Sequence, residues 1–211
     1  MTIEYELFAT PVVFVVDSDV TVRDALAAMI RAGGWQSRTA ASAEEFLMLP
    51  DAVAPGCLVT ELHLPGMSGL DLQRRVRDRE ELPIIFMSAN ADLRDTVRAM
   101  KAGAFEFLPK PVLPDLLRDA IRAAMERSYF ALRQLTQIRM LRERYDQLSR
   151  REREVMSLLV RGRLNKQVGG ELGISEITVK AHRGRMMRKM QAASFAELVT
   201  MAASLHQPLH L

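Results

Sequence analysis

Four groups of polar residues have side chains that could carry phosphoryl chemistry, and each group directly follows a short apolar run. A carboxylate can act as a nucleophile or metal ligand, a hydroxyl can donate to a phosphoryl oxygen, and an ammonium can neutralise phosphate charge. The groups could act together if the apolar runs are parallel strands that end at one edge of a sheet. They are Asp17-Ser18-Asp19 after VVFVV, Glu61 after CLVT, Ser88 after IIFM and Lys110 after FEFLP.

The first half of the chain has the alternating pattern that such a sheet requires. Short apolar runs alternate with segments of helical periodicity, and Gly or Pro residues punctuate their ends. This alternation predicts right-handed βαβ units and an α/β, doubly wound, five-stranded parallel sheet. The expected strands are Val12–Val16, Gln36–Ala40, Leu58–Val59, Ile84–Met87 and Phe105–Leu108, and the expected helices are Val22–Arg31, Ala43–Leu49, Leu70–Arg77 and Leu93–Met100.

Two interpretations of this constellation compete. VVFVVDSDVTV resembles the signature of haloacid dehalogenase phosphatases, an apolar strand followed by Asp-x-Asp-x-Thr. That resemblance implies Asp17 as nucleophile, Asp19 as acid/base, and Ser88 and Lys110 as phosphate-holding residues. The superfamily also needs a late acidic pair for Mg²⁺, whereas the next acids here fall in a long helical segment with no further strand end to present them.

The second interpretation rests on VVFVVDSD, ELHLPGMSG, IIFMSA and FEFLPKP. Together these motifs resemble the receiver domain of two-component response regulators over residues 11–125, and they imply its flavodoxin-like fold. The resemblance gives each matching position a role. Asp17 and position 18 would help to hold Mg²⁺, position 61 would be the phosphoacceptor, Ser88 would bond a phosphoryl oxygen, Phe107 would be the rotating aromatic residue and Lys110 would pair with the phosphate.

The sequence departs from the receiver pattern at two positions that do the chemistry. Glu61 stands where the phosphoacceptor Asp is expected, and Ser18 replaces the second acid of the metal-binding pair. One extra C–C bond displaces the carboxylate by roughly 1.5 Å, and a misplacement of about 1 Å can cost ~100-fold in rate. The lost carboxylate also weakens Mg²⁺ binding. We expect little or no phosphorylation, no cofactor, and at most weak Mg²⁺ binding at Asp17 and Glu61.

Three functional states of this receiver remain open. Glu61 could accept a hydrogen bond from Ser88 and pair with Lys110, which would imitate part of a phosphorylated state with one negative charge instead of about two. The receiver could instead be inactive and serve for dimerisation or ligand response. The third alternative is a conventional response regulator that is switched by phosphorylation.

Charge is distributed unevenly along the chain, and this asymmetry indicates a polyanionic partner for the C-terminal end. Residues 149–211 carry a net charge of +6 and residues 1–148 a net charge of −3. No Gly or Pro interrupts residues 115–161, so a long helix, or two helices joined by a brief break, connects the halves. We expect a receiver-like domain over 1–125, a helical linker over 126–147 and a DNA-binding domain over 148–211.

Four short helices are predicted in the basic part, over Arg150–Arg161, Asn165–Leu172, Glu176–Met190 and Ser194–Leu205. Ser149 with Glu152 forms a capping-box pattern, Asn165 is expected to cap the second helix and Ser175 the third. Residues 148–204, which begin with LSRREREVMSLLVRGRLNKQVGG, resemble the LuxR-type helix-turn-helix of the FixJ/NarL response regulators. On the third helix we expect an inward side of Ile177, Val179, Met186, Met187 and Met190.

The resemblance implies that Lys180, Ala181 and Gly184 face base edges in the major groove, while Thr178 and nearby basic residues hold the DNA backbone. From the residue types, Lys180 and Arg183 could read bases directly, and Ala181 could touch a thymine methyl. Lys166, Arg185, Arg188 and Lys189 are phosphate candidates that position without specifying sequence. The full set of DNA-binding candidates is Lys166, Ser175, Thr178, Lys180, Ala181, His182, Arg183, Gly184, Arg185, Arg188 and Lys189.

These patterns predict a cytoplasmic transcription factor that binds pseudo-palindromic double-stranded DNA as a homodimer and is not an enzyme. A sensor kinase and RNA polymerase are further candidate partners. The single cysteine, Cys57, is expected to be a small buried hydrophobe. No apolar run approaches the ~20 residues needed to span a bilayer, and the N-terminal segment lacks the basic region of an export signal.

Overall fold

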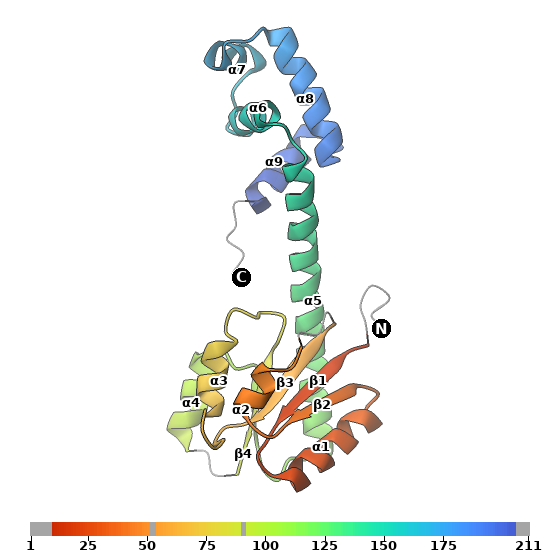
Figure 1. The fold of residues 1–211 in the computed structure, drawn as a ribbon, viewed down its shortest axis with the longest axis vertical. Helices are drawn as coiled ribbons and strands as arrows, with labels where there is room; N and C mark the ends of the chain where they lie inside the picture. Colours follow the sequence, from red (N-terminus) through yellow and green to blue (C-terminus); the bar gives the residue numbers. More distant parts are fainter. Residues whose placement is uncertain (1–9, 51–53, 90–91, 206–211) are drawn as a thin grey trace. The chain divides into compact units, whose positions relative to one another are not determined.

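The computed structural model describes residues 10–50, 54–89 and 92–205. The chain divides into two compact units, of which the first extends to Arg133 and the second begins at Gln134. The long helix α5 (Pro114–Asp146) carries the chain from the first unit into the second (Figure 1). The N-terminal segment 1–9, which is expected not to be an export signal, lies outside the described residues.

The first unit contains the predicted five-stranded parallel sheet. Its strands are β1 (Val12–Val16), β2 (Gln36–Ala40), β3 (Gly56–Glu61), β4 (Ile84–Ser88) and β5 (Glu106–Pro109). They are arranged in the order β2-β1-β3-β4-β5, and every pairing is parallel. Parallel strands bring their carboxyl ends to the same edge, so the residues that follow β1, β3, β4 and β5 meet there.

Helices cover both faces of the sheet, as the apolar runs predict. Alternate residues of β1 point to opposite faces. Val13 and Val15 pack with α1 (Val20–Ala32) and the first part of α5, and Phe14 packs on the other face with α2 (Ala43–Leu47) and α3 (Gly69–Arg75). The helix α4 (Leu93–Lys101) adds Ala99 to this second core. Cys57 is fully buried, as expected.

A buried serine ties α5 to the sheet. The side chain of Ser128 is completely buried; its hydroxyl accepts a hydrogen bond from the Gly56 backbone N at 2.9 Å and donates to the Glu81 carbonyl at 2.5 Å. These bonds give partners to two backbone groups that no helix or strand pairs. A buried backbone group without a partner would cost free energy. The first part of α5 is therefore an integral part of the core of the first unit.

The second unit contains the four predicted helices: α6 (Arg150–Val160), α7 (Asn165–Leu172), α8 (Glu176–Met190) and α9 (Phe195–Leu205). The capping box of Ser149 and Glu152 is confirmed. The predicted cap at Asn165 is wrong, because Leu164 occupies the N-cap position and its backbone N donates to Gln167 Oε1 at 2.9 Å. Asn165 begins the helix instead, one residue too late to cap it.

The two adjacent glycines inside α7 have different environments. A Cβ on Gly169 would lie 2.7 Å from the carbonyl oxygen of Ile174, whereas a Cβ on Gly170 would meet nothing within 4 Å. Gly169 is therefore needed for the close approach of α7 to the turn before α8, and the Ile174 backbone N donates to the Gly169 carbonyl at 3.0 Å. Gly170 carries the usual helix cost of about 1 kcal/mol relative to Ala without a packing reason.

Among the helices in the described part of the chain, none combines the length and apolar character that crossing a membrane requires.

Candidate functional site

The carboxyl edge of the sheet contains a lysine held between two carboxylates. The Nζ of Lys110, which follows β5, lies 2.5 Å from Oδ2 of Asp17 and 2.5 Å from Oε2 of Glu61. Asp17 is 2% exposed and Glu61 is half-buried at the last position of β3. Three of the predicted site residues thus form one hydrogen-bonded cluster across β1, β3 and β5.

The other oxygens of the two carboxylates bind backbone N–H groups. Oδ1 of Asp17 accepts from the Asp19 backbone N at 2.9 Å. Oε1 of Glu61 accepts from the backbone N of Leu62 at 2.8 Å and of His63 at 3.3 Å. All four carboxylate oxygens therefore accept hydrogen bonds from the protein itself.

These contacts keep the cluster charged. Burial alone would raise the pKa of Glu61, but the hydrogen bond and charge of Lys110, with smaller contributions from the His63 backbone and Ser88, leave that pKa below its ordinary value. Burial would lower the pKa of Lys110, and the two carboxylates outweigh it and raise that pKa. At neutral pH Glu61 is therefore an anion and Lys110 a cation.

The carboxylates that would bind Mg²⁺ already accept hydrogen bonds from the protein's own donors. The ion prefers near-octahedral oxygen ligands, and it is bound in proteins through one or two carboxylates. Here Lys110 occupies one oxygen of Asp17 and one of Glu61, and backbone donors occupy the others. Ser18, in the position of the second metal-binding acid, is exposed and carries no carboxylate. Nor do the described residues include a group of three or more His, Cys, Asp or Glu that could hold a metal.

Ser88 faces His63 and weakly contacts Glu61, whereas Phe107 packs against the core of the first unit. The Ser88 hydroxyl lies 3.5 Å from Nδ1 of His63, and Nε2 of that histidine lies 3.7 Å from Oδ2 of Asp95 on α4. Ser88 affects Glu61 through the small contribution to its pKa. The ring of Phe107 is partly buried and stacks on Phe86 with a centroid distance of 6.2 Å.

Asp19, the acid/base of the phosphatase interpretation, has a structural role. Its Oδ1 accepts from the backbone N of Thr21 at 2.8 Å and of Val22 at 3.4 Å, so the side chain caps α1. The next acids along the chain, Asp115 and Asp119, lie on α5, as the sequence predicts. The phosphatase interpretation therefore lacks both its free acid/base and a strand end for its metal pair.

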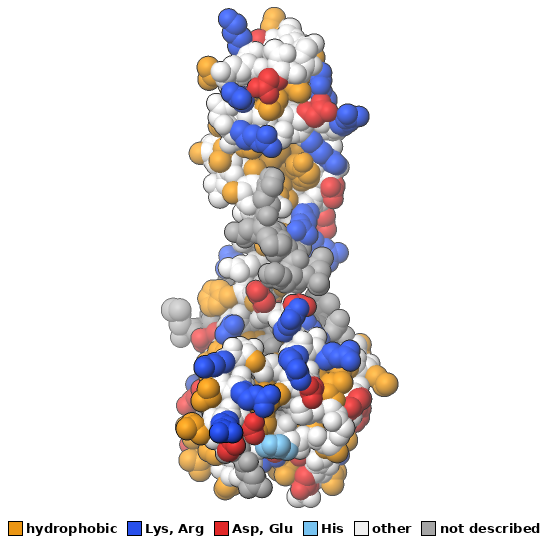
Figure 2. All heavy atoms as spheres, turned by 90° about the vertical axis from the view of Figure 1, so that its left-hand side faces the viewer, with side chains coloured by type: hydrophobic (Ala, Val, Ile, Leu, Met, Phe, Trp, Pro, Cys, Tyr) orange, Lys and Arg blue, Asp and Glu red, His pale blue; other side chains and the backbone are white. Residues whose placement is uncertain are grey.

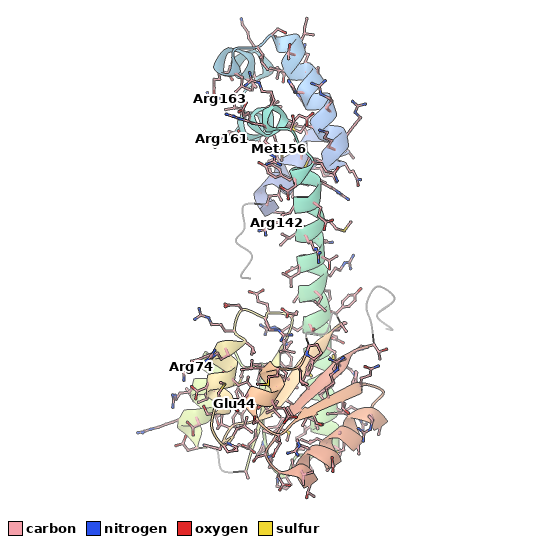
Figure 3. The ribbon with its side chains drawn as sticks, viewed as in Figure 1. Glu44, Arg74, Arg142, Met156, Arg161 and Arg163 are labelled. Atoms are coloured by element: carbon pink, nitrogen blue, oxygen red, sulfur yellow. The ribbon has the colours of Figure 1, made fainter. Side chains whose placement is uncertain are left out.

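The loop after Glu61 is held by a residue that the sequence patterns did not single out. Glu44 on α2, labelled in Figure 3, accepts from the Met67 backbone N through Oε1 at 3.0 Å. This bond lies beside Gly66, whose positive φ of 77° favours glycine. Glu44 anchors the turn that positions the loop. The sequence gives no local sign of this contact, because its partner lies 23 positions along the chain.

Helix α8 presents a polar and partly apolar face to solvent. Val179, Met186 and Met190 are buried in the core of the second unit. The predicted inward orientation of Ile177 is wrong, since this side chain is 80% exposed. The remaining site candidates on α8 divide into exposed residues (Lys180, Ala181, Gly184, Arg185 and Arg188) and half-buried ones (Thr178, His182, Arg183 and Lys189), with Lys166 exposed on α7.

The N-terminus of α8 has the predicted cap. Ser175 Oγ accepts from the Thr178 backbone N at 3.1 Å and lies 2.8 Å from the Thr178 hydroxyl. Near the start of the helix, Lys180 pairs with Glu176 at 3.1 Å, and this exposed pair can exchange for a phosphate at little cost. The guanidinium of Arg183 lies 4.8 Å from the centre of the Phe195 ring on α9, so it packs within the domain.

A buried glutamate anchors the C-terminal half of α8 to α6. Glu152 is 2% exposed, and its carboxylate lies 2.7 Å from Lys189 Nζ and 3.4 Å from Arg185 Nε. Burial would raise its pKa, but Lys189 and the bonds from Ser149 lower it to about 2. The sequence identifies Glu152 only as a capping residue. Its ionic contacts lie 33 and 37 positions along the chain, where no local pattern can reveal them.

Exposed cations remain on the second unit despite these internal pairs. Figure 2 shows Lys and Arg side chains distributed over its visible face. Such a surface attracts a polyanion, and the Gly-containing turn between α7 and α8 gives the pair the geometry of a helix-turn-helix.

Comparison with known families agrees with both halves of this description. Residues 13–122 match the response regulator receiver domain, and residues 146–202 match the bacterial regulatory proteins of the luxR family. The fold and the two matches define a receiver joined to a LuxR-type helix-turn-helix domain.

Several known proteins resemble this chain over most of its length and of their own. The response regulator protein TodT of Pseudomonas putida is 40% identical over 94% of this chain and 88% of its own length. The transcriptional regulatory protein FixJ of Rhizobium meliloti is 39% identical over 90% of this chain and 94% of its own. Among solved structures, the response regulator StyR is 41% identical with a TM-score of 0.80, covering 92% of this chain and 99% of that one. Full-length FixJ from B. japonicum is 32% identical with a TM-score of 0.53, covering 92% and 96%. The chain belongs to the DNA-binding transcriptional response regulators of the LuxR/FixJ type.

Proposed function

We propose that this response regulator binds pseudo-palindromic DNA as a homodimer through α8 and does so without phosphorylation of its receiver. The observation that carries this proposal is the Lys110 ammonium held at 2.5 Å from both Asp17 and Glu61. In the receiver family the matching lysine pairs with the phosphate. Here the matching lysine, Lys110, pairs with the carboxylate of Glu61.

Two further features support a receiver that does not need phosphate. Both oxygens of Glu61 accept hydrogen bonds, one of them from the Lys110 ammonium, and these contacts reduce the nucleophilicity of the carboxylate toward a phosphoryl donor. The carboxylate oxygens that would bind Mg²⁺ are also engaged, and the metal is what neutralises the developing charge in phosphoryl transfer. Glu61 supplies one of the roughly two negative charges of a phosphoaspartate, which makes it a partial substitute.

Dimer mass and DNA affinity of four samples test this proposal. They are the untreated protein, protein treated with acetyl phosphate and Mg²⁺, Glu61→Asp and Glu61→Gln, each checked for phosphate by mass spectrometry. We expect the untreated protein to dimerise and bind without phosphate, and Glu61→Gln to bind more weakly because it lacks the charge facing Lys110. If only phosphorylated protein binds, the receiver is a conventional switch. If Glu61→Gln binds as the wild type does, the receiver is an inactive dimerisation module.

The DNA-binding assignment of α8 has its own control. Lys180→Ala removes an exposed cation from the face that is proposed to enter the major groove, and Lys101→Ala removes an exposed cation from α4 in the receiver. Loss of affinity is expected for the first variant and not for the second. Equal affinity of Lys180→Ala and the wild type for selected DNA would place the contact surface elsewhere.

A further inference from the structure

The most exposed large apolar side chain of the second unit's described part lies on its DNA-binding helix. Ile177 is 80% exposed and occupies the second position of α8. Its helical neighbours at i+4 and i+7 are Ala181 and Gly184, both exposed, so the three residues lie on one face together with Lys180. The buried side, which carries Val179 and Met186, points the other way.

An isoleucine in this position has no folding role to explain it. Exposed apolar area brings no burial energy, and β-branched residues are less favourable in helices than Ala or Leu. The side chain is also aimed toward the helix N-terminus, as helical side chains are. In helix-turn-helix proteins the first residues of the second helix are those that contact base edges.

The neighbouring residues leave room for Ile177 to reach the floor of a groove. Ala181 is small, and a Cβ on Gly184 would meet nothing within 4 Å. This face therefore combines one long aliphatic side chain with two short positions near the start of the helix; Lys180 lies beside them, and the exposed cations Arg185 and Arg188 follow toward the C-terminus. The only apolar group that a base pair displays in the major groove is the C5-methyl of thymine.

We propose that Ile177 is a specificity-determining residue that reads a thymine C5-methyl in each half-site of the operator. This inference rests on the proposed binding of DNA through α8. Ile177 selects thymine over cytosine and purines by burying its γ- and δ-carbons against the methyl group, while Lys180 supplies the polar contact on the same face.

Replacement of thymine by deoxyuridine tests this contact, because it removes the methyl and leaves base pairing unchanged. A preferred site is first selected from a random duplex pool with the full-length wild-type protein. Each thymine of the site is then replaced in turn, and affinity is measured for the wild type, Ile177→Ala and Leu164→Ala. Leu164 is the matched control, since it is 70% exposed in the same unit but outside α8.

At one thymine per half-site we expect deoxyuridine to weaken wild-type binding about fourfold, the value of one buried methyl group. Ile177→Ala should show no penalty at that position, and Leu164→Ala should keep it. If the penalties are the same in the wild type and Ile177→Ala at every thymine, Ile177 does not read the methyl and the proposal is wrong. If the pool yields no preferred site, or Lys180→Ala binds it unchanged, the assignment of α8 itself fails, which is a separate result.

Discussion

Replacing Glu152 with glutamine should lower the free energy of unfolding of the second unit by about 3 kcal/mol at pH 7. In the folded protein the pKa of Glu152 is about 2, against an ordinary value of 4.5. That difference corresponds to ~3 kcal/mol of preferential stabilisation of the charged form, since each pKa unit equals about 1.36 kcal/mol. Glutamine retains an oxygen that can accept from the Ser149 backbone N, so the loss comes from the charge facing Lys189 and Arg185.

The effect has a definite pH dependence. Because folding depresses the pKa of Glu152, its stabilisation is fully present above the ordinary value of 4.5 and is lost as the pH falls toward about 2. The difference in unfolding free energy between the wild type and Glu152→Gln should therefore be constant near neutral pH, shrink below pH 4.5 and approach zero near pH 2.

Two spectroscopic signals separate the units during urea unfolding. The single tryptophan, Trp35, lies in the first unit, so its fluorescence reports that unit alone. Far-UV circular dichroism reports helices of both, and the transition seen only by dichroism belongs to the second unit. Glu154→Gln is the control, because Glu154 forms surface pairs with Arg150 and Arg151 that are worth less than about 1 kcal/mol. A loss for Glu152→Gln as small as the control's, or one that does not shrink in acid, would refute the reasoning.

Three further predictions use the same protein. Gly170→Ala should raise the unfolding free energy of the second unit by about 0.5–1 kcal/mol. Gly169→Ala should lower it, since the added Cβ would overlap a backbone carbonyl. Unfolding followed by circular dichroism measures both variants, and a shift of the same sign in the two would contradict this prediction. Ser128→Ala should cost the first unit about 1–3 kcal/mol, because two backbone groups lose their partner, and tryptophan fluorescence measures it. Arg188→Ala should reduce the slope of log DNA affinity against log salt concentration by about one per protomer. Lys189→Ala should mainly reduce stability, because its ammonium is held by the buried carboxylate of Glu152. DNA titrations at several salt concentrations measure the slope for each variant.

The sequence predicts the elements well because each is encoded by neighbouring residues. The apolar runs indicate β1, β3, β4 and β5, the position of Gln36–Ala40 between two helical segments allows β2, and helical periodicity with Ser caps indicates α6 and α8. Asn165 is predicted as the cap of α7 because Asn is a favourable capping residue, and this prediction is wrong. Leu164 occupies the N-cap position, and its backbone N donates to the side chain of Gln167. The preference of Asn for the N-cap position is therefore overridden here, where the Gln167 side chain satisfies the Leu164 backbone N.

The candidate site divides in the same way. Parallel strands predict that Asp17, Glu61 and Lys110 meet, and the structure brings them within hydrogen-bonding distance. The sequence could not show that Ser88 would face His63 more directly than Glu61, because that depends on side-chain rotation at the sheet edge. The prediction for Ile177 fails for a related reason. It assigns an apolar residue to the core by type alone and does not consider the side of the helix on which the residue lies, and Ile177 is exposed.

The charge asymmetry of the chain overstates what is available to DNA. Glu152 binds two cations of α8 in a buried site, so those charges contribute to the structure of the domain. Glu154 and Glu171 also hold arginines, but these pairs are exposed and can exchange their carboxylates for phosphates at a cost of about 1 kcal/mol or less. Net charge therefore indicates the class of partner, whereas the burial of each counter-ion determines which cations can reach it. On this basis we expect Arg188 and Lys166, both exposed, to be better phosphate ligands than Lys189, although residue type alone assigns all three the same role.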